Sequence, residues 1–129
     1  MKLKLVEIYN ARISLDKLFS EERLTQKMKY RLGFLIKELK DITEQQQELM
    51  IKHGAVAKNG GYVLEENTGD YGKEFFEFLN EEIEVRYTAI SLEELENLKD
   101  ENDEMIVKLN AYDYQTLIDT FIDPGDKLD

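Results

Sequence analysis

The feature that most constrains the fold is a stripe of mostly apolar side chains that recur at alternating steps of four and three residues. Two such positions per heptad form a narrow stripe, by which one long helix packs along another element. We call this stripe the seam. It consists of Met28, Leu32, Leu35, Leu39, Ile42, Gln46, Leu49 and His53.

The seam predicts one long helix over residues 21–53. Ser20 precedes two glutamates, which is typical of an N-cap followed by acids at the positive end of the helix dipole. Gly54 is a conventional helix stop. A helix of about 33 residues spans roughly 50 Å at 1.5 Å per residue. One small core cannot bury such a rod along its whole length, so another element must cover part of it.

Three covers are open for the seam. The chain can use its own helix at 111–122 and the apolar segment 75–79, or the cover can be a second copy or another protein. Gln46 is a polar seam position, which can fix the register of such a pairing. If the cover is a partner, we expect it to contact the five aliphatic seam positions Leu32, Leu35, Leu39, Ile42 and Leu49.

The rest of the chain predicts short strands and turns. Asn59-Gly60-Gly61 lies between two apolar segments and predicts a tight hairpin, because these residues adopt positive φ readily. Residues 82–89 alternate between apolar and polar and give the clearest strand in the chain. Residues 105–109 are a candidate strand beside it, and the first residues, 3–8, fit either a strand or an early helix start.

Short helices complete the predicted fold. Ser91 and Glu94 form a capping box, and Asn110 caps a last helix over 111–122. The fold class is therefore α+β and predominantly helical. It has one long helix of about 30 residues, a small antiparallel sheet or hairpin, and two or three shorter helices. Residues 1–122 form a single domain, and 123–129 form an acidic C-terminal tail.

Charge is distributed unevenly along the chain. The formal net charge is −11, but residues 1–53 sum to +3 and residues 54–129 sum to −14. Such an acidic surface disfavours direct binding to nucleic acid and favours solubility. It is either a solvated face or an imitation of a phosphate backbone. The acidic positions are Glu81, Glu82, Glu84, Glu93, Glu94, Glu96, Asp100, Glu101, Asp103 and Glu104.

A basic cluster opposes this acidity within the long helix. Asp and Glu at i+3 or i+4 can pair with some of its members. We expect the remaining surface to dock onto an acidic one, for which the chain's own C-terminal half is a candidate. The cluster consists of Lys27, Lys29, Arg31, Lys37 and Lys40, with Tyr30 and Phe34 interleaved.

No constellation of residues predicts catalysis, a cofactor or a metal site. The chain has no cysteine and one histidine, His53, which we interpret as a helix-end residue. Residues 100–104 resemble the start of a calcium loop but lack its glycine and its final glutamate. No apolar run reaches the roughly 18–20 residues of a membrane-spanning helix. The chain is expected to be soluble and intracellular.

The layout of the chain carries a resemblance. "KYRLGFLIKELKDITEQQQELMIKHG" is followed by the turn "KNGGYVL", then by "EFFEFLNEEIEVRYTAISLEELENL" and the closing "LNAYDYQTLIDTFI". This order resembles that of small acidic proteins of unassigned function from tailed bacteriophages and prophages. The resemblance implies a phage gene product that acts in the infected cell or in virion assembly. It supplies no activity, cofactor or site residue.

These observations lead to two functional hypotheses. The first is a non-enzymatic phage protein that binds another protein, as an assembly accessory or as a modulator of a host factor. It would act in the cytoplasm of the bacterial host or in the virion, and it would form homo-oligomers if the long helix pairs with a second copy. The alternative is an acidic DNA mimic that inhibits a host or defence nuclease or another DNA-binding protein.

Overall fold

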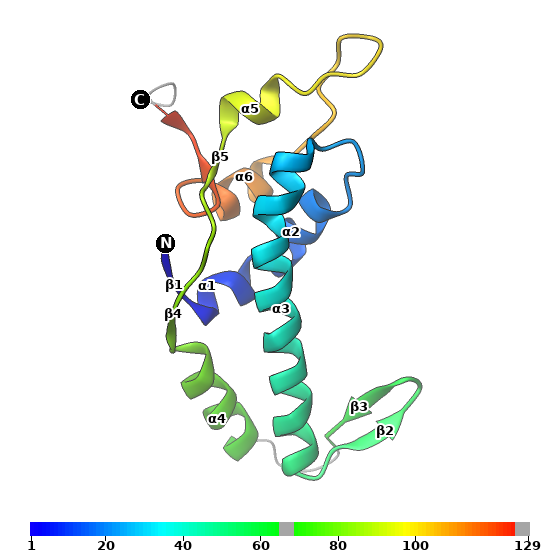
Figure 1. Cartoon of the computed structure of the whole chain (residues 1–129). Helices are drawn as coiled ribbons and strands as arrows, with labels where there is room; N and C mark the ends of the chain where they lie inside the picture. The colour runs from blue at the N-terminus through cyan, green and yellow to red at the C-terminus, as the bar shows by residue number, and fades with distance from the viewer. Residues whose placement is uncertain (65–68, 126–129) are drawn as a thin grey trace.

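The computed structural model describes residues 1–64 and 69–125 (Figure 1). The chain is predominantly helical with small sheets, so the predicted α+β class is confirmed. The described residues contain five helices besides the long one, more than the two or three predicted. In chain order the elements are β1 (Lys2–Lys4), α1 (Leu5–Asn10), α2 (Arg12–Phe19), α3 (Gln26–Lys52), β2 (Val56–Lys58), β3 (Gly61–Val63), α4 (Gly69–Leu79), β4 (Glu82–Glu84), β5 (Ile90–Ser91), α5 (Leu92–Glu96), α6 (Ala111–Leu117) and β6 (Ile122–Asp123).

The long helix α3 begins later than predicted. Ser20 is the C-cap of α2, and Thr25 caps α3 through its hydroxyl, which accepts a hydrogen bond from the Met28 amide at 3.2 Å. The predicted start at residue 21 was wrong because Glu21 binds the side chain of Arg23 and so stabilises a turn. The end was predicted correctly, since Gly54 follows the last turn with a φ of +90°.

The chain itself covers the seam. Helices α1, α2 and α4 all pack against α3 (Figure 1). Leu35 and Ile42 are 0% and 1% exposed and lie in one core with residues from both halves of the chain. The seam is therefore covered by the chain itself in this structure. The predicted cover 75–79 belongs to α4 and packs on α3, whereas the predicted cover 111–122 contains α6, which packs on α2.

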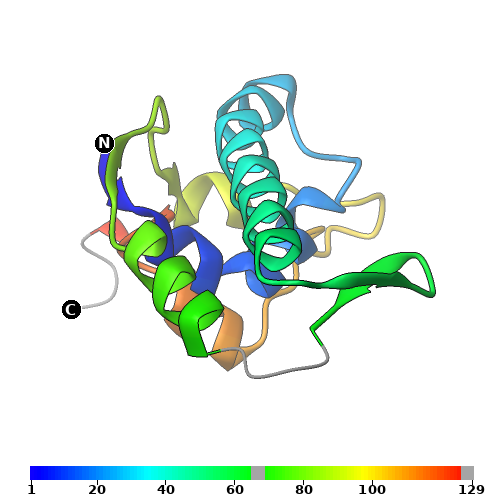
Figure 2. The same cartoon turned by 90° about the horizontal axis from the view of Figure 1, so that it is seen from below.

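The sheets are small, and two of them join segments that are distant in the sequence. β1 pairs with β4 in antiparallel fashion, and β5 pairs with β6 in parallel. The predicted hairpin is present as β2 and β3, with Asn59 and Gly60 at φ values of 52° and 82°. This hairpin projects from the side of the molecule, as the view from below shows (Figure 2).

The predicted strand over 82–89 is a strand only at Glu82–Glu84. Its alternation has another cause, because Val85 and Tyr87 are buried without belonging to a strand. The Tyr87 hydroxyl donates to the Phe121 carbonyl oxygen at 2.6 Å, and burial raises the pKa of Tyr87 to about 12. Residues 105–109 do not pair with this segment; Met105 forms an isolated bridge with Lys99.

Helix α6 is shorter than the predicted 111–122. Asn110 caps it as expected, accepting from the Asp113 amide at 2.8 Å. The helix ends at Leu117, because Asp119 has a φ of 68° and the chain then turns into β6. The turn allows Ile122 to be fully buried. The predicted acidic tail therefore begins inside a strand at residue 123, and residues 126–129 lie outside the described part.

A buried carboxylate fixes α6 onto α2. Asp113 is 1% exposed, and its two oxygens accept from the Ser14 hydroxyl at 2.8 Å and the Lys17 ammonium at 2.9 Å. Lys17 is the main cause that lowers the pKa of Asp113, against the opposing effect of burial. The charged form is therefore favoured in the folded state, and this contact positions α6.

No helix within residues 1–64 and 69–125 is long and apolar enough to cross a membrane.

Leu35→Ala tests whether the seam is core. Removing a fully buried leucine side chain should lower the free energy of unfolding by about 2–5 kcal/mol. Ile36→Ala is the matched control, since Ile36 is 44% exposed on the same helix and should change stability far less. Urea unfolding of both variants measures the difference, and equal stability would contradict a core role for Leu35.

Asp113→Asn tests the buried contact. The amide keeps one acceptor oxygen but loses the charge that pairs with the Lys17 ammonium and the second acceptor, so the free energy of unfolding at neutral pH should fall by roughly 1.5–3 kcal/mol. The stabilisation by Asp113 is present above its unfolded pKa of about 3.9 and is lost as the pH falls through its lower folded pKa. The variant should therefore lose less stability on acidification than the wild type.

The control for this experiment is Asp16→Asn, which changes an exposed aspartate on α2, the helix that carries Ser14 and Lys17. It should leave both the stability at neutral pH and its acid dependence close to wild type. Urea titrations at neutral pH and at about pH 3 would measure both quantities. An Asp113→Asn curve that overlies the wild type at both values would show that the contact contributes nothing.

Candidate functional site

The structure buries most of the side chains predicted to bind a partner. Leu32, Leu35, Ile42 and Leu49 are core residues, and Leu39 is half-buried. A partner that used them would have to displace the helices that pack on α3. The seam is therefore not the exposed surface that a protein contact requires, and the candidate site has to be sought elsewhere.

The ten predicted acidic positions fall into two groups. Glu81, Glu82 and Glu84 lie on or beside β4, next to the N-terminal strand β1. The other seven lie on α5 and the loop after it, at the end of the molecule where α3 begins (Figure 1). These seven are Glu93, Glu94, Glu96, Asp100, Glu101, Asp103 and Glu104.

Several of these carboxylates have partners within the chain. Glu84 pairs with the N-terminal ammonium group at 3.1 Å, and Glu94 pairs with Arg31 at 3.1 Å. Asp103 and Glu104 lie 3.5 and 3.6 Å from lysines on the same loop. Asp100 accepts backbone hydrogen bonds within the loop, which lower its pKa. The contacts of Asp100, Asp103 and Glu104 shape the loop. Glu93 and Glu101 remain exposed to solvent.

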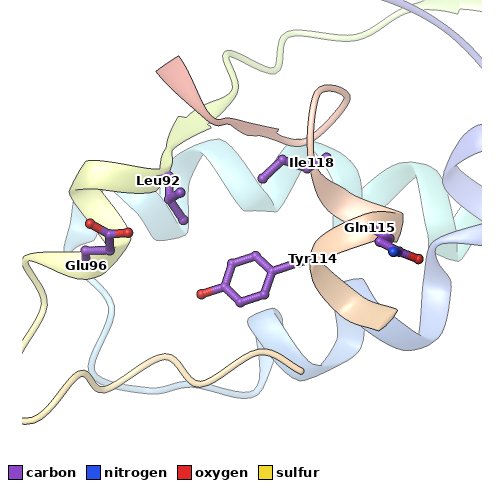
Figure 3. Close-up of a pocket in the computed structure, with 5 residues that line it drawn as sticks. All are labelled: Leu92, Glu96, Tyr114, Gln115 and Ile118. Atoms are coloured by element: carbon purple, nitrogen blue, oxygen red, sulfur yellow. The ribbon is translucent and has the colours of Figure 1, made fainter. Parts of the chain in front are cut away.

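An apolar groove lies between α5 and α6, beside the second acidic group. It encloses about 330 Å³. The Tyr114 ring extends from α6 toward α5, and Leu92 and Ile118 line the same space (Figure 3). Glu96 and Gln115 complete the lining. The site thus combines an apolar interior with the carboxylate of Glu96 in its lining and with the exposed Glu93 on the same helix α5.

Polar contacts hold the α5 side of the groove in place. The Ser91 hydroxyl accepts from the Glu94 amide, and the Glu94 carboxylate accepts from the Ser91 amide, both at 3.0 Å. This is the predicted capping box. The Ser91 amide is the largest cause that lowers the pKa of Glu94, and Arg31 lowers it further. Arg31 lies on α3, so the ion pair fixes α5 to the long helix.

The sequence did not reveal this groove. Tyr114 and Ile118 lie within the last helix predicted over 111–122, and both are half-buried against the core. Their spacing of four residues does place them on one face of α6. That face meets a gap because α5 is anchored to α3 and α6 to α2, which is a tertiary arrangement that no local pattern contains.

His53 lies at the C-cap of α3, as expected, and contacts α4. Its Nε2 is 3.2 Å from a carboxylate oxygen of Glu74, which also pairs with Lys52 at 3.0 Å. Lys52 is the largest cause that lowers the pKa of Glu74. This cluster joins α3 to α4. In the described part of the chain, no three His, Cys, Asp or Glu residues are grouped so that they can hold a metal ion.

Comparison with protein-family models, with curated proteins and with solved structures finds no match. The role of the groove is therefore argued from its geometry and charge. Apolar walls hold apolar side chains, and the nearby carboxylates favour a positively charged ligand.

Glu94→Gln tests the ion pair that positions α5. Glutamine preserves the capping box, so the variant isolates the interaction with Arg31. Because the pair is partly exposed, the free energy of unfolding should fall by about 1 kcal/mol or less. Glu93→Gln changes the neighbouring exposed glutamate and should have a smaller effect. Urea unfolding measures both, and equal values would show that the ion pair does not stabilise α5.

Proposed function

We propose that this chain works by binding another protein, and that the contact centres on the groove between α5 and α6. The observation that supports this is an apolar interior lined by Leu92, Tyr114 and Ile118, together with the Glu96 carboxylate in the lining and the exposed Glu93 on the same helix α5. Interfaces gain affinity from apolar and aromatic side chains at their centre, and charges at the rim steer the encounter.

The chemistry of the groove favours one kind of ligand. One or two apolar side chains fit a space of about 330 Å³. Lysine or arginine residues beside them would meet the acidic helix α5, which carries Glu96 in the lining and the exposed Glu93. The ligand is therefore a basic segment with apolar anchors on one face, as in an amphipathic helix. In the biological setting that the resemblance implies, the chain with this groove would be a phage protein that acts as an assembly accessory or modulates a host factor.

DNA mimicry is the weaker alternative. A mimic needs an extended array of free negative charges, whereas the ten acidic positions lie in two groups and several are paired within the chain. Mimicry also gives no role to the apolar groove. The two functions differ in what they demand of Tyr114 and of Glu81, which lies in the other acidic group.

A labelled synthetic helix of leucine and lysine at amphipathic spacing is a suitable probe. Tyr114→Ala should weaken its binding about tenfold, because the variant removes the aromatic wall of the groove. Glu93→Lys should weaken it too, most strongly at low salt. Fluorescence anisotropy of the probe measures both dissociation constants, and circular dichroism verifies that the variants are folded.

Two matched controls make this experiment decisive. Tyr112→Ala removes a 67% exposed tyrosine from the same helix but outside the groove, and Glu81→Lys reverses a charge in the other acidic group. Both should bind the probe almost as wild type does. Equal losses from Glu81→Lys and Glu93→Lys, without an effect of Tyr114→Ala, would overturn the groove and support a diffuse acidic surface of the kind that mimicry uses.

A further inference from the structure

The outer face of α3 carries a basic surface that the proposed function leaves without a role. Residues 23–37 contain five Lys or Arg residues and no Asp or Glu, in a chain whose net charge is −11. Arg23 and Arg31 form ion pairs within the chain. Lys27, Lys29 and Lys37 are exposed and form no ion pair with any residue in the described part of the chain.

Apolar side chains lie among these lysines. Tyr30 is 71% exposed, and its ring packs edge-on against Phe34 with 5.2 Å between the centroids. Ile36 is also exposed. At 100° per residue, Tyr30, Gly33 and Lys37 lie on the side of the helix opposite the seam. Lys27 lies on one flank of this side, and Lys29 and Ile36 lie on the other. We call the half of the helix surface formed by Lys27, Lys29, Tyr30, Gly33, Ile36 and Lys37 the basic ridge.

Gly33 at the centre of the ridge is not required by close packing within the described part of the chain. A glycine inside a helix costs about 1 kcal/mol relative to alanine. Apart from the backbone of its own helix, a Cβ at Gly33 would meet no atom of residues 1–64 or 69–125 within 4 Å, so no packing among these residues requires a glycine here. A position without a side chain does allow another protein surface to approach the helix closely. The glycine therefore points to an intermolecular contact.

We infer that the basic ridge of one copy binds in the α5–α6 groove of a second copy, an inference that rests on the proposed function of that groove. The two surfaces match in chemistry. The ridge presents Tyr30 among lysines, whereas the groove presents the apolar Leu92 and Ile118 with Glu96 in its lining and the exposed Glu93 on the same helix.

The charges at the contact favour association of two copies, although each copy has a net charge of −11. At physiological ionic strength the Debye length is about 8 Å, so distant carboxylates repel weakly while opposed surface charges in contact still attract. Since ridge and groove are different surfaces of one chain, the contact is heterologous. Each copy donates one ridge and one groove, and the assembly closes into a ring or extends as a filament.

The test is sedimentation velocity across a concentration series, with complementary variants. The ridge variant carries Lys29→Glu and Lys37→Glu. The groove variant carries Tyr114→Ala and Glu93→Gln, which disrupt the groove without creating a positive charge that could attract the reversed ridge. Wild type should form species larger than a dimer, and each variant alone should be monomeric. An equimolar mixture should form a heterodimer and nothing larger, because it contains one intact ridge and one intact groove per pair.

A variant at Gly33 tests the contact without changing charge. Gly33→Gln replaces a poor helix former by a good one, so the monomer should be at least as stable as wild type. The new side chain obstructs the close approach, and self-association should weaken about tenfold or more. Lys73→Glu and Glu77→Lys reverse exposed charges on α4, at the other end of α3, and should associate as wild type does.

The outcomes separate this inference from the proposed function. A wild type that is monomeric at every concentration, yet binds the leucine–lysine probe in its groove, overturns self-association and leaves the proposed function intact. A wild type that neither self-associates nor binds the probe, although it is folded, overturns both. If the wild type is monomeric and its ridge instead binds a single-stranded oligonucleotide that the ridge variant does not bind, the ridge is a nucleic-acid surface and the inference is wrong.

Discussion

Burial of the seam on α3 is the constraint on which the rest of the structure depends. A helix of 27 residues carries one narrow apolar stripe along its length. No other helix of the described chain is as long, so several short elements together cover the stripe. Helices α1 and α2 precede α3 in the sequence, and α4 follows it. The small sheets then join distant segments, as β1 joins β4 across about 80 residues. The topology is thus a set of short pieces arranged along one rod.

Local patterns predicted the parts of the fold that depend on neighbouring residues. The seam spacing, Gly54, the Asn59-Gly60 turn and the caps at Ser91 and Asn110 all act within a few residues, and the structure contains each of them. The chain's choice of cover for the seam depends on distant contacts and stayed open. The alternation at 85–87 shows the limit of such patterns, because side chains alternate between core and solvent in any extended segment, whether or not it joins a sheet.

The candidate site was less predictable than the fold for the same reason. Composition located the acidic half of the chain, but not its division into two groups or the pairing of Glu94 with a residue 63 positions away. The groove arises because its two helices are attached to different supports. α5 is held to α3 by Arg31, and α6 is held to α2 by the buried Asp113. The separation of α5 and α6 is therefore set by these two supports, and the facing side chains do not fill the space between the helices.

The two faces of α3 explain why the inferred contact surface lies on this helix. The inner face is held rigid by the core, so side chains on the outer face project from a backbone that does not need to be ordered on binding. Such preorganisation lowers the entropic cost of an interface. Tyr30 gains further order from its edge-on contact with Phe34. Burial of the seam removes the predicted contact surface, and the same burial makes the opposite face of the helix a rigid platform.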